Sequence, residues 1–134
     1  DLTVVTNGIN IALELVDSPH EVIIPGGNLK KRTLALVGPV AEDYLEGLNA
    51  EKAFIGANGI DLDAGVTTPD LVEANVKKRM AEKAKEVIIL ADHSKFNTVT
   101  LVEVLDLEQV DKIITDDNLD ETVKKEFSQQ VDIL

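Results

Sequence analysis

The chain has 134 residues, of which 44% are hydrophobic and 28% charged, and 25 acidic against 13 basic side chains give it a formal net charge of −12. This length predicts one modest domain with its own core. The negative net charge argues against direct binding of nucleic acid. Because the chain has no cysteine, it can form neither disulfides nor thiolate metal sites. No apolar run reaches the length of a membrane span and the first residues lack a signal-peptide pattern, so we expect a cytoplasmic protein without membrane contact.

The first segments alternate strand and helix patterns. The apolar run Leu2–Val5 predicts a short strand, and Asn7 is suited to cap a helix over Ile9–Val16. A second strand is expected at Glu21–Ile24, where the turn sequence Pro25-Gly26-Gly27 ends it.

A second helix is predicted to begin at Pro39, because proline suits the first helical position, and to run to about Leu48. The residues expected on its buried stripe are Val40, Tyr44, Leu45 and Leu48. A strand over Lys52–Ile55 should follow, and a long polar loop is expected from Gly56 onward.

The next helix has the clearest start. The Thr68 hydroxyl is suited to cap it, Pro69 would occupy its first position, and Asp70 and Glu73 lie where they favour the helix dipole. The row expected to pack on a sheet is Val72, Val76, Met80 and Ala84.

The remaining elements continue the alternation. After a strand at Val87–Leu90 and a connector over residues 97–110, we expect a strand at Lys112–Thr115, a helix at Asp120–Gln129 and a last strand at Val131–Leu134. Five to six short aliphatic strands separated by helices predict an α/β domain with a mostly parallel sheet and flanking helices.

The segment Ala91-Asp92-His93-Ser94-Lys95-Phe96 follows the strand Val87–Leu90 directly and brings a carboxylate, a hydroxyl and an ammonium. Ligands bind outside the carboxyl ends of strands in open α/β sheets, where Asp92 could accept from a sugar hydroxyl and Lys95 could hold an anion. An ordinary polar turn is the alternative, because these are common turn residues.

The one basic cluster, Lys30-Lys31-Arg32, is too small for a DNA footprint but is sufficient for one phosphate-bearing ligand, or it is a solvated turn. His93 is expected to be an exposed turn residue. His20 and His93 are not clustered in the sequence, which argues against a metal site, and no cofactor is expected.

Six blocks taken together resemble a known family. They are Leu2-Thr3-Val4-Val5-Thr6-Asn7, Pro25-Gly26-Gly27-Asn28-Leu29-Lys30-Lys31-Arg32, Leu36-Val37-Gly38-Pro39, Ala53-Phe54-Ile55-Gly56-Ala57-Asn58-Gly59-Ile60, Gly65-Val66-Thr67-Thr68-Pro69 and residues 91–96. In this order and spacing, with Ile113-Ile114-Thr115-Asp116 closing the pattern, they resemble the C-terminal effector-sensing domain of DeoR-type transcriptional repressors of sugar metabolism.

The resemblance implies a fold related to ribose-5-phosphate isomerases and a domain, residues 1–134, that binds a phosphorylated sugar or related metabolite. It also implies that a separate N-terminal helix-turn-helix module binds operator DNA. We expect residues 1–134 to lack that module and also the strand and Ser/Gly/Thr-rich turn with which the family's sensing domain usually opens before the segment matching Leu2. In the full-length protein we expect a homo-oligomer, because operators read by helix-turn-helix proteins are commonly paired half-sites.

The sequence departs from the isomerase pattern at two points that matter for catalysis. The isomerase motif Gly-Ala-Asp-Glu-Val-Asp is matched by Gly56-Ala57-Asn58-Gly59-Ile60-Asp61, so an amide replaces one carboxylate, and no glutamate clearly matches the isomerase base. Asn58 cannot act as a base near neutral pH. The resemblance therefore favours a sensor over an enzyme, and a small sugar-phosphate isomerase or hydrolase using Asp92, Asp61 and Lys95 remains the alternative.

The residues expected to contact the effector are Asp92, Lys95, Asn58, Gly59, Asp61, Thr6, Asn7, Lys31 and Arg32. For the Asn58–Asp61 group the alternative is turn chemistry, and for Thr6 and Asn7 it is simple capping.

Overall fold

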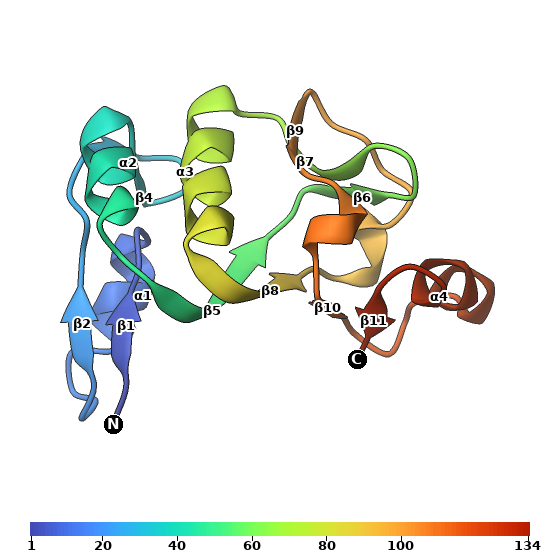
Figure 1. The fold of residues 1–134 in the computed structure, drawn as a ribbon, viewed down its shortest axis with the longest axis horizontal. Helices are drawn as coiled ribbons and strands as arrows, with labels where there is room; N and C mark the ends of the chain where they lie inside the picture. The colour runs from blue at the N-terminus through green and yellow to red at the C-terminus, as the bar shows by residue number, and fades with distance from the viewer. The chain divides into compact units, whose positions relative to one another are not determined.

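A computed structural model describes residues 1–134, and the chain divides into two compact units, Asp1–Leu48 and Asn49–Leu134. Figure 1 follows the chain from the first unit into the second, with the elements labelled. The expected α/β class is confirmed, because the second unit contains a four-stranded parallel sheet with flanking helices. No helix is long and apolar enough to span a bilayer.

The first unit combines one parallel strand pair with one hairpin. Its elements in chain order are β1 (Thr3–Val5), α1 (Ile9–Glu14), β2 (Glu21–Ile23), β3 (Asn28–Lys30), β4 (Ala35–Val37) and α2 (Pro39–Glu46). The strands β1 and β2 are parallel, as the intervening helix requires, whereas β3 and β4 form an antiparallel hairpin.

Two expectations for the first unit are wrong in detail. Gly8, not Asn7, is the N-cap of α1, because the Asn7 amide instead donates to the Leu36 carbonyl at 3.0 Å and ties the segment before α1 to β4. On α2 the buried residues are Ala41 and Leu45, while two of the expected stripe residues, Val40 and Tyr44, are exposed.

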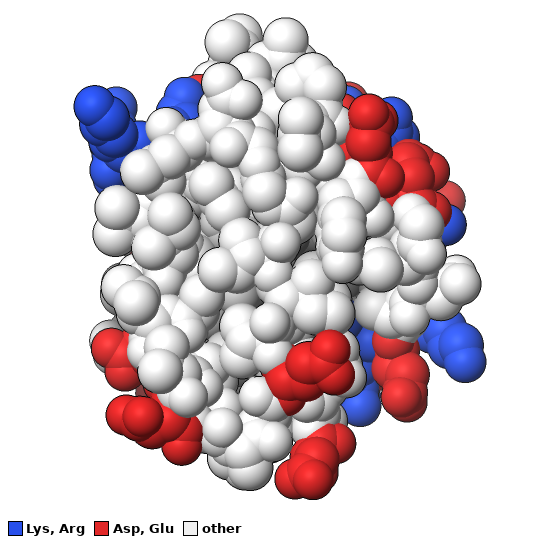
Figure 2. All heavy atoms as spheres, turned by 90° about the vertical axis from the view of Figure 1, so that its left-hand side faces the viewer, with Lys and Arg blue, Asp and Glu red and all other residues white.

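Exposed apolar side chains are numerous in the first unit. A cavity of about 410 Å³ is lined by residues of α1, the turn after it and β2, namely Ile9, Ala12, Leu13, Leu15, Val16, His20, Val22 and Ile24. In the face drawn in Figure 2, residues other than Lys, Arg, Asp and Glu cover most of the surface, and most of the charged side chains lie toward the edges of the view.

The second unit is built on a parallel sheet with the strand order β11-β10-β8-β5. The strands are β5 (Ala50–Gly56), β8 (Ala84–Leu90), β10 (Lys112–Ile114) and β11 (Asp132–Ile133), and the helices are α3 (Leu71–Glu82) and α4 (Glu121–Ser128). Successive residues Val87, Ile88 and Ile89 are all buried, as expected for a strand covered on both faces.

An antiparallel sheet of three strands occupies positions where the sequence predicted loops. Its strands are β6 (Gly59–Asp61), β7 (Gly65–Thr68) and β9 (Val102–Leu105), in the order β6-β7-β9. The expected long loop after Gly56 therefore contains a hairpin, and the expected connector over 97–110 contains a strand and a 3₁₀ turn, Leu107–Gln109. These strands have only three or four residues, which is too short for a clear period-two pattern.

The start of α3 also differs from the expectation. Thr68 pairs with Val102 as the last residue of β7, so the helix cap is Asp70, whose carboxylate accepts from the Glu73 N–H at 2.9 Å. On α3 the buried residues are Ala74, Val76 and Ala81, whereas Val72 is 41% exposed. The short side chain of alanine lets the helix lie close to the sheet.

The core of the second unit is mainly aliphatic, with two aromatic rings. Phe96 and Phe127 are both buried and meet edge to face with centroids 5.1 Å apart. Phe96 follows the polar segment after β8 and Phe127 belongs to α4, so this contact anchors that segment to the core.

Candidate functional site at the carboxyl ends of β5, β8 and β10

Three neighbouring strands of the parallel sheet end at the same level. Gly56 at the end of β5 is paired with Leu90 of β8, and Leu90 is in turn paired with Ile114 of β10. The polar segments that follow these strands therefore begin side by side. Because open α/β sheets bind ligands outside the carboxyl ends of their strands, this edge is the candidate site.

The predicted pair Asp92 and Lys95 is brought together at this edge. Asp92 caps the 3₁₀ turn His93–Lys95, accepting from the backbone N–H of Ser94 at 2.8 Å and from the Ser94 hydroxyl. Lys95 Nζ lies 3.6 Å from Asp92 Oδ2. These Ser94 hydrogen bonds, with a smaller contribution from the Lys95 charge, lower the pKa of Asp92 below its ordinary value.

The Asp92–Lys95 turn lies beside the loop that contains Asn58. Directly after the turn, Phe96 forms a bridge with Ile60 of β6, and the Asn97 N–H donates to the Ile60 carbonyl at 2.7 Å. Asn58 is exposed, and its Oδ1 accepts from the Thr68 hydroxyl at 3.0 Å. That bond orients the amide and leaves its NH₂ group as a donor for another molecule.

Gly59 and Asp61 hold the local structure of the same hairpin. Gly59 has no side chain and is buried beside the backbone of Thr98, where an added Cβ would clash. It can therefore contact a ligand only through main-chain groups. Asp61 Oδ2 accepts from the backbone N–H groups of Asp63 and Ala64 at 3.0 and 2.9 Å, which stabilises the turn between β6 and β7.

The other four predicted residues belong to the first unit. Thr6 is buried and accepts from the Gly8 N–H at 3.1 Å, while Asn7 holds the Leu36 carbonyl as described above. Lys31 and Arg32 lie in the exposed turn between β3 and β4. Neither side chain caps α1: Thr6 stabilises the turn before the helix, and Asn7 ties that turn to β4.

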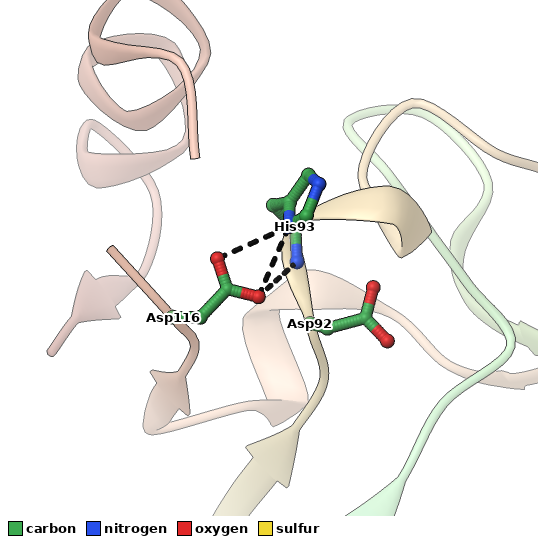
Figure 3. Close-up of side chains that lie close together, drawn as sticks. All are labelled: Asp92, His93 and Asp116. Atoms are coloured by element: carbon green, nitrogen blue, oxygen red, sulfur yellow. Dashed lines mark hydrogen bonds and ion pairs between the residues drawn. The ribbon is translucent and has the colours of Figure 1, made fainter. Parts of the chain in front are cut away.

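A further contact links the segments after β8 and β10. His93 donates its backbone N–H to Asp116 Oδ2 at 3.0 Å, and its ring Nδ1 lies 3.0 Å from the same oxygen. Figure 3 shows the Asp116 carboxylate facing His93, with the Asp92 carboxylate directed elsewhere. The hydrogen bonds from His93 lower the pKa of Asp116.

Asp92, His93 and Asp116 are also the residues that could hold a metal ion. They are exposed, and each offers one ligand atom within 4.8 Å of the others. Imidazole nitrogen and carboxylate oxygen are common ligands of divalent metals. Asp92 is already engaged by Ser94 and Lys95, whereas the bonds between His93 and Asp116 join the segments that follow β8 and β10.

Comparison with known proteins places the chain in a protein family. The family model described as the DeoR C terminal sensor domain matches residues 1–117. The chain belongs to the DeoR sensor domain family. Curated relatives of this sensor domain are named as HTH-type transcriptional regulators or as transcriptional repressors.

Three relatives illustrate the range of sequence identity. The HTH-type transcriptional regulator GlpR of Haloferax volcanii is 43% identical over 123 residues, which cover 92% of this chain and 48% of GlpR. The HTH-type transcriptional regulator IolR of Bacillus subtilis is 39% identical, covering 90% of this chain and 49% of IolR. The putative aga operon transcriptional repressor of Escherichia coli O157:H7 is 34% identical, and the match covers 89% of this chain and 45% of that repressor. The DeoR sensor domain described here thus spans about half the length of the curated relatives it matches.

Two side chains at the site edge of this DeoR sensor domain were not predicted from the sequence. Asp116 lies two residues beyond the end of β10, the same offset that Asp92 has from β8, and that shared offset was an available signal. Lys77 of α3 donates from Nζ to the Gly56 carbonyl at 2.9 Å. No local signal in the sequence marks this contact, since 21 residues separate its partners.

Proposed function

We propose that this chain is the ligand-sensing domain of a cytoplasmic transcriptional regulator and that it binds a phosphorylated sugar or related metabolite beside the Asp92–Lys95 turn. Binding would modulate the affinity of a separate helix-turn-helix domain for operator DNA. The single observation that supports the ligand site is that Asp92 and Lys95 follow β8 and Asn58 follows β5, two neighbouring strands whose ends are level.

The chemistry of these groups suits a sugar. The Asp92 carboxylate and the Asn58 amide can accept from and donate to hydroxyl groups, and the Lys95 ammonium can donate to a sugar or phosphate oxygen. Lys95 is 35% exposed, so it is accessible while its stem is packed. Ligand binding that favours one of two arrangements of the DNA-binding domains would supply the regulatory coupling.

The enzyme alternative is not favoured, because the relatives are named as regulators and the Asn58 position lacks a base. Turnover of ribose 5-phosphate by the pure protein would reverse that preference. We also propose that the full-length regulator is a homo-oligomer, because operators with paired half-sites need two DNA-binding domains. Light scattering at micromolar concentration should show a dimer or larger, and a strictly monomeric species would contradict this.

The site is tested by calorimetric titration with pentose and hexose phosphates. A charge-assisted contact contributes about 1.5–3 kcal/mol, so Lys95→Ala should weaken binding roughly 10- to 100-fold. Lys85→Ala is the matched control, because Lys85 is exposed on the same strand but at its opposite end. An unchanged affinity in Lys95→Ala would remove Lys95 from the site.

Asp92 can be tested by two substitutions that differ in what they retain. Asp92→Asn keeps an acceptor and the shape of the side chain, whereas Asp92→Ala removes both. If Asp92 accepts from a sugar hydroxyl, Asp92→Asn should weaken binding less than Asp92→Ala does. Equal losses would instead assign Asp92 the role of orienting Lys95, whose ammonium lies 3.6 Å away.

A further inference from the structure

Lys77 places a cation at the same edge of the sheet from a different element. Its Nζ donates to the carbonyl of Gly56, the last residue of β5, across a distance of 2.9 Å. Gly56 is paired with Leu90, and Asp92 lies two residues beyond Leu90. Because neighbouring strands are roughly 4.8 Å apart, the Lys77 ammonium and the Asp92–Lys95 turn belong to adjacent strand ends.

The electrostatics of this edge leave a specific role for Lys77. Asp92 and Asp116 bring two carboxylates, and Lys95 is already paired with Asp92, so this part of the edge suits neutral hydroxyl groups better than a full anion. Lys77 is partly buried, and burial lowers its pKa while the charge of Glu73 opposes that shift. A partly desolvated ammonium gains more from an anionic partner than a fully hydrated one does.

Lys77 also retains hydrogen-bonding capacity. An ammonium group has three N–H donors, and only one is used, in the bond to the Gly56 carbonyl. The remaining two are available to an acceptor at the end of β5. Its neighbour Lys78, on the same helix, makes no comparable bond to the end of β5.

We propose that Lys77 directly contacts the anionic group of the ligand. The site then covers two adjacent strand ends, with the phosphate at β5 beside Lys77 and the sugar hydroxyls at β8 beside Asp92 and Lys95. This assignment rests on the proposed function, and it makes Lys77 the residue that distinguishes a phosphorylated sugar from the free sugar.

A purely structural role of Lys77 predicts a different result. If Lys77 serves only to tie α3 to β5, its loss should lower the thermal stability and weaken the binding of every ligand to the same extent. If it contacts the anion, only ligands that carry the phosphate should lose affinity.

The test is calorimetric titration of the intact protein with pentose and hexose phosphates, the corresponding free sugars and inorganic phosphate. Lys77→Met should weaken binding of the best phosphorylated sugar roughly 10- to 100-fold and leave its free sugar unaffected. Lys77→Arg retains the charge and should keep most of the affinity. Lys78→Met removes the same charge one residue away and should behave as wild type.

Lys77→Gln keeps a donor for the Gly56 carbonyl without the charge, so it provides the same comparison if Lys77→Met does not fold. Selective loss of phosphate binding in Lys77→Gln supports the proposal. Wild-type affinity in Lys77→Gln, or an equal loss for the phosphorylated and free sugars, overturns the Lys77 assignment alone. A wild-type protein that binds no phosphorylated probe overturns both this assignment and the proposed ligand class.

Discussion

Gly59 allows a quantitative test of how the loop beside the Asp92–Lys95 turn is held. A Cβ atom added at Gly59 would lie 2.6 Å from the Thr67 hydroxyl oxygen and would clash with the Thr98 carbonyl. Neither neighbour can retreat freely. Thr67 is fully buried and its hydroxyl accepts from the Thr100 N–H at 2.9 Å, while the segment before Thr98 is fixed by the Asn97 bond to β6.

The expected cost of Gly59→Ala combines two effects. Overpacking in a rigid environment costs roughly 1–3 kcal/mol, and disturbing a buried hydrogen bond costs roughly another 1–3 kcal/mol. With an unfolding entropy of about 0.3 kcal/mol/K for a chain of this length, the melting temperature should fall by roughly 7 to 20 °C. Because Gly59 lies next to Asn58, sugar-phosphate affinity should fall as well.

Gly56→Ala is the matched control, since a Cβ at Gly56 meets no atom within 4 Å. Its melting temperature should stay close to that of wild type, because a substitution without a clash changes stability by only about 0.5 kcal/mol. Thermal unfolding followed by circular dichroism measures both variants. A Gly59→Ala protein that melts with the wild type, or a Gly56→Ala protein that is equally destabilised, would refute the packing argument.

Three further outcomes are expected. Phe127→Ala should destabilise the protein by about 3–5 kcal/mol in urea unfolding, because Phe127 is fully buried against Phe96, and a change below about 1 kcal/mol would contradict that role. The pKa of Asp116 is lower in the folded protein than its ordinary value of 3.8, because His93 donates hydrogen bonds to the carboxylate. The contact therefore stabilises the fold above pH 3.8, and this stabilisation is lost as the pH falls through the lowered pKa of the folded state. Asp116→Asn should accordingly reduce the acid sensitivity of unfolding. The 134-residue chain should not shift duplex DNA in a low-salt gel assay, because its net charge is −12, and micromolar binding to arbitrary duplex would show that this reasoning fails.

Local sequence patterns determined the class of fold and much of its element order. The buried run Val87–Ile89 shows a strand covered on both faces, and Pro39 marks the first residue of α2 as expected. These signals are local, since hydrophobic periodicity and proline geometry depend on a few neighbouring residues. The six ordered motifs likewise indicated the DeoR sensor family, which the family match over residues 1–117 confirmed.

Tertiary structure decided the features that depend on residues far apart in the chain. Thr68 looks like a helix cap in sequence but became a strand residue, because β9, more than thirty residues later, supplies its hydrogen-bonding partners. The alignment of Gly56, Leu90 and Ile114, and the contact of Lys77 with the end of β5, likewise follow from strand register and helix packing. Local sequence determined which polar residues follow each strand, whereas long-range pairing decided which of them meet, because register is set by contacts that no short window of sequence contains.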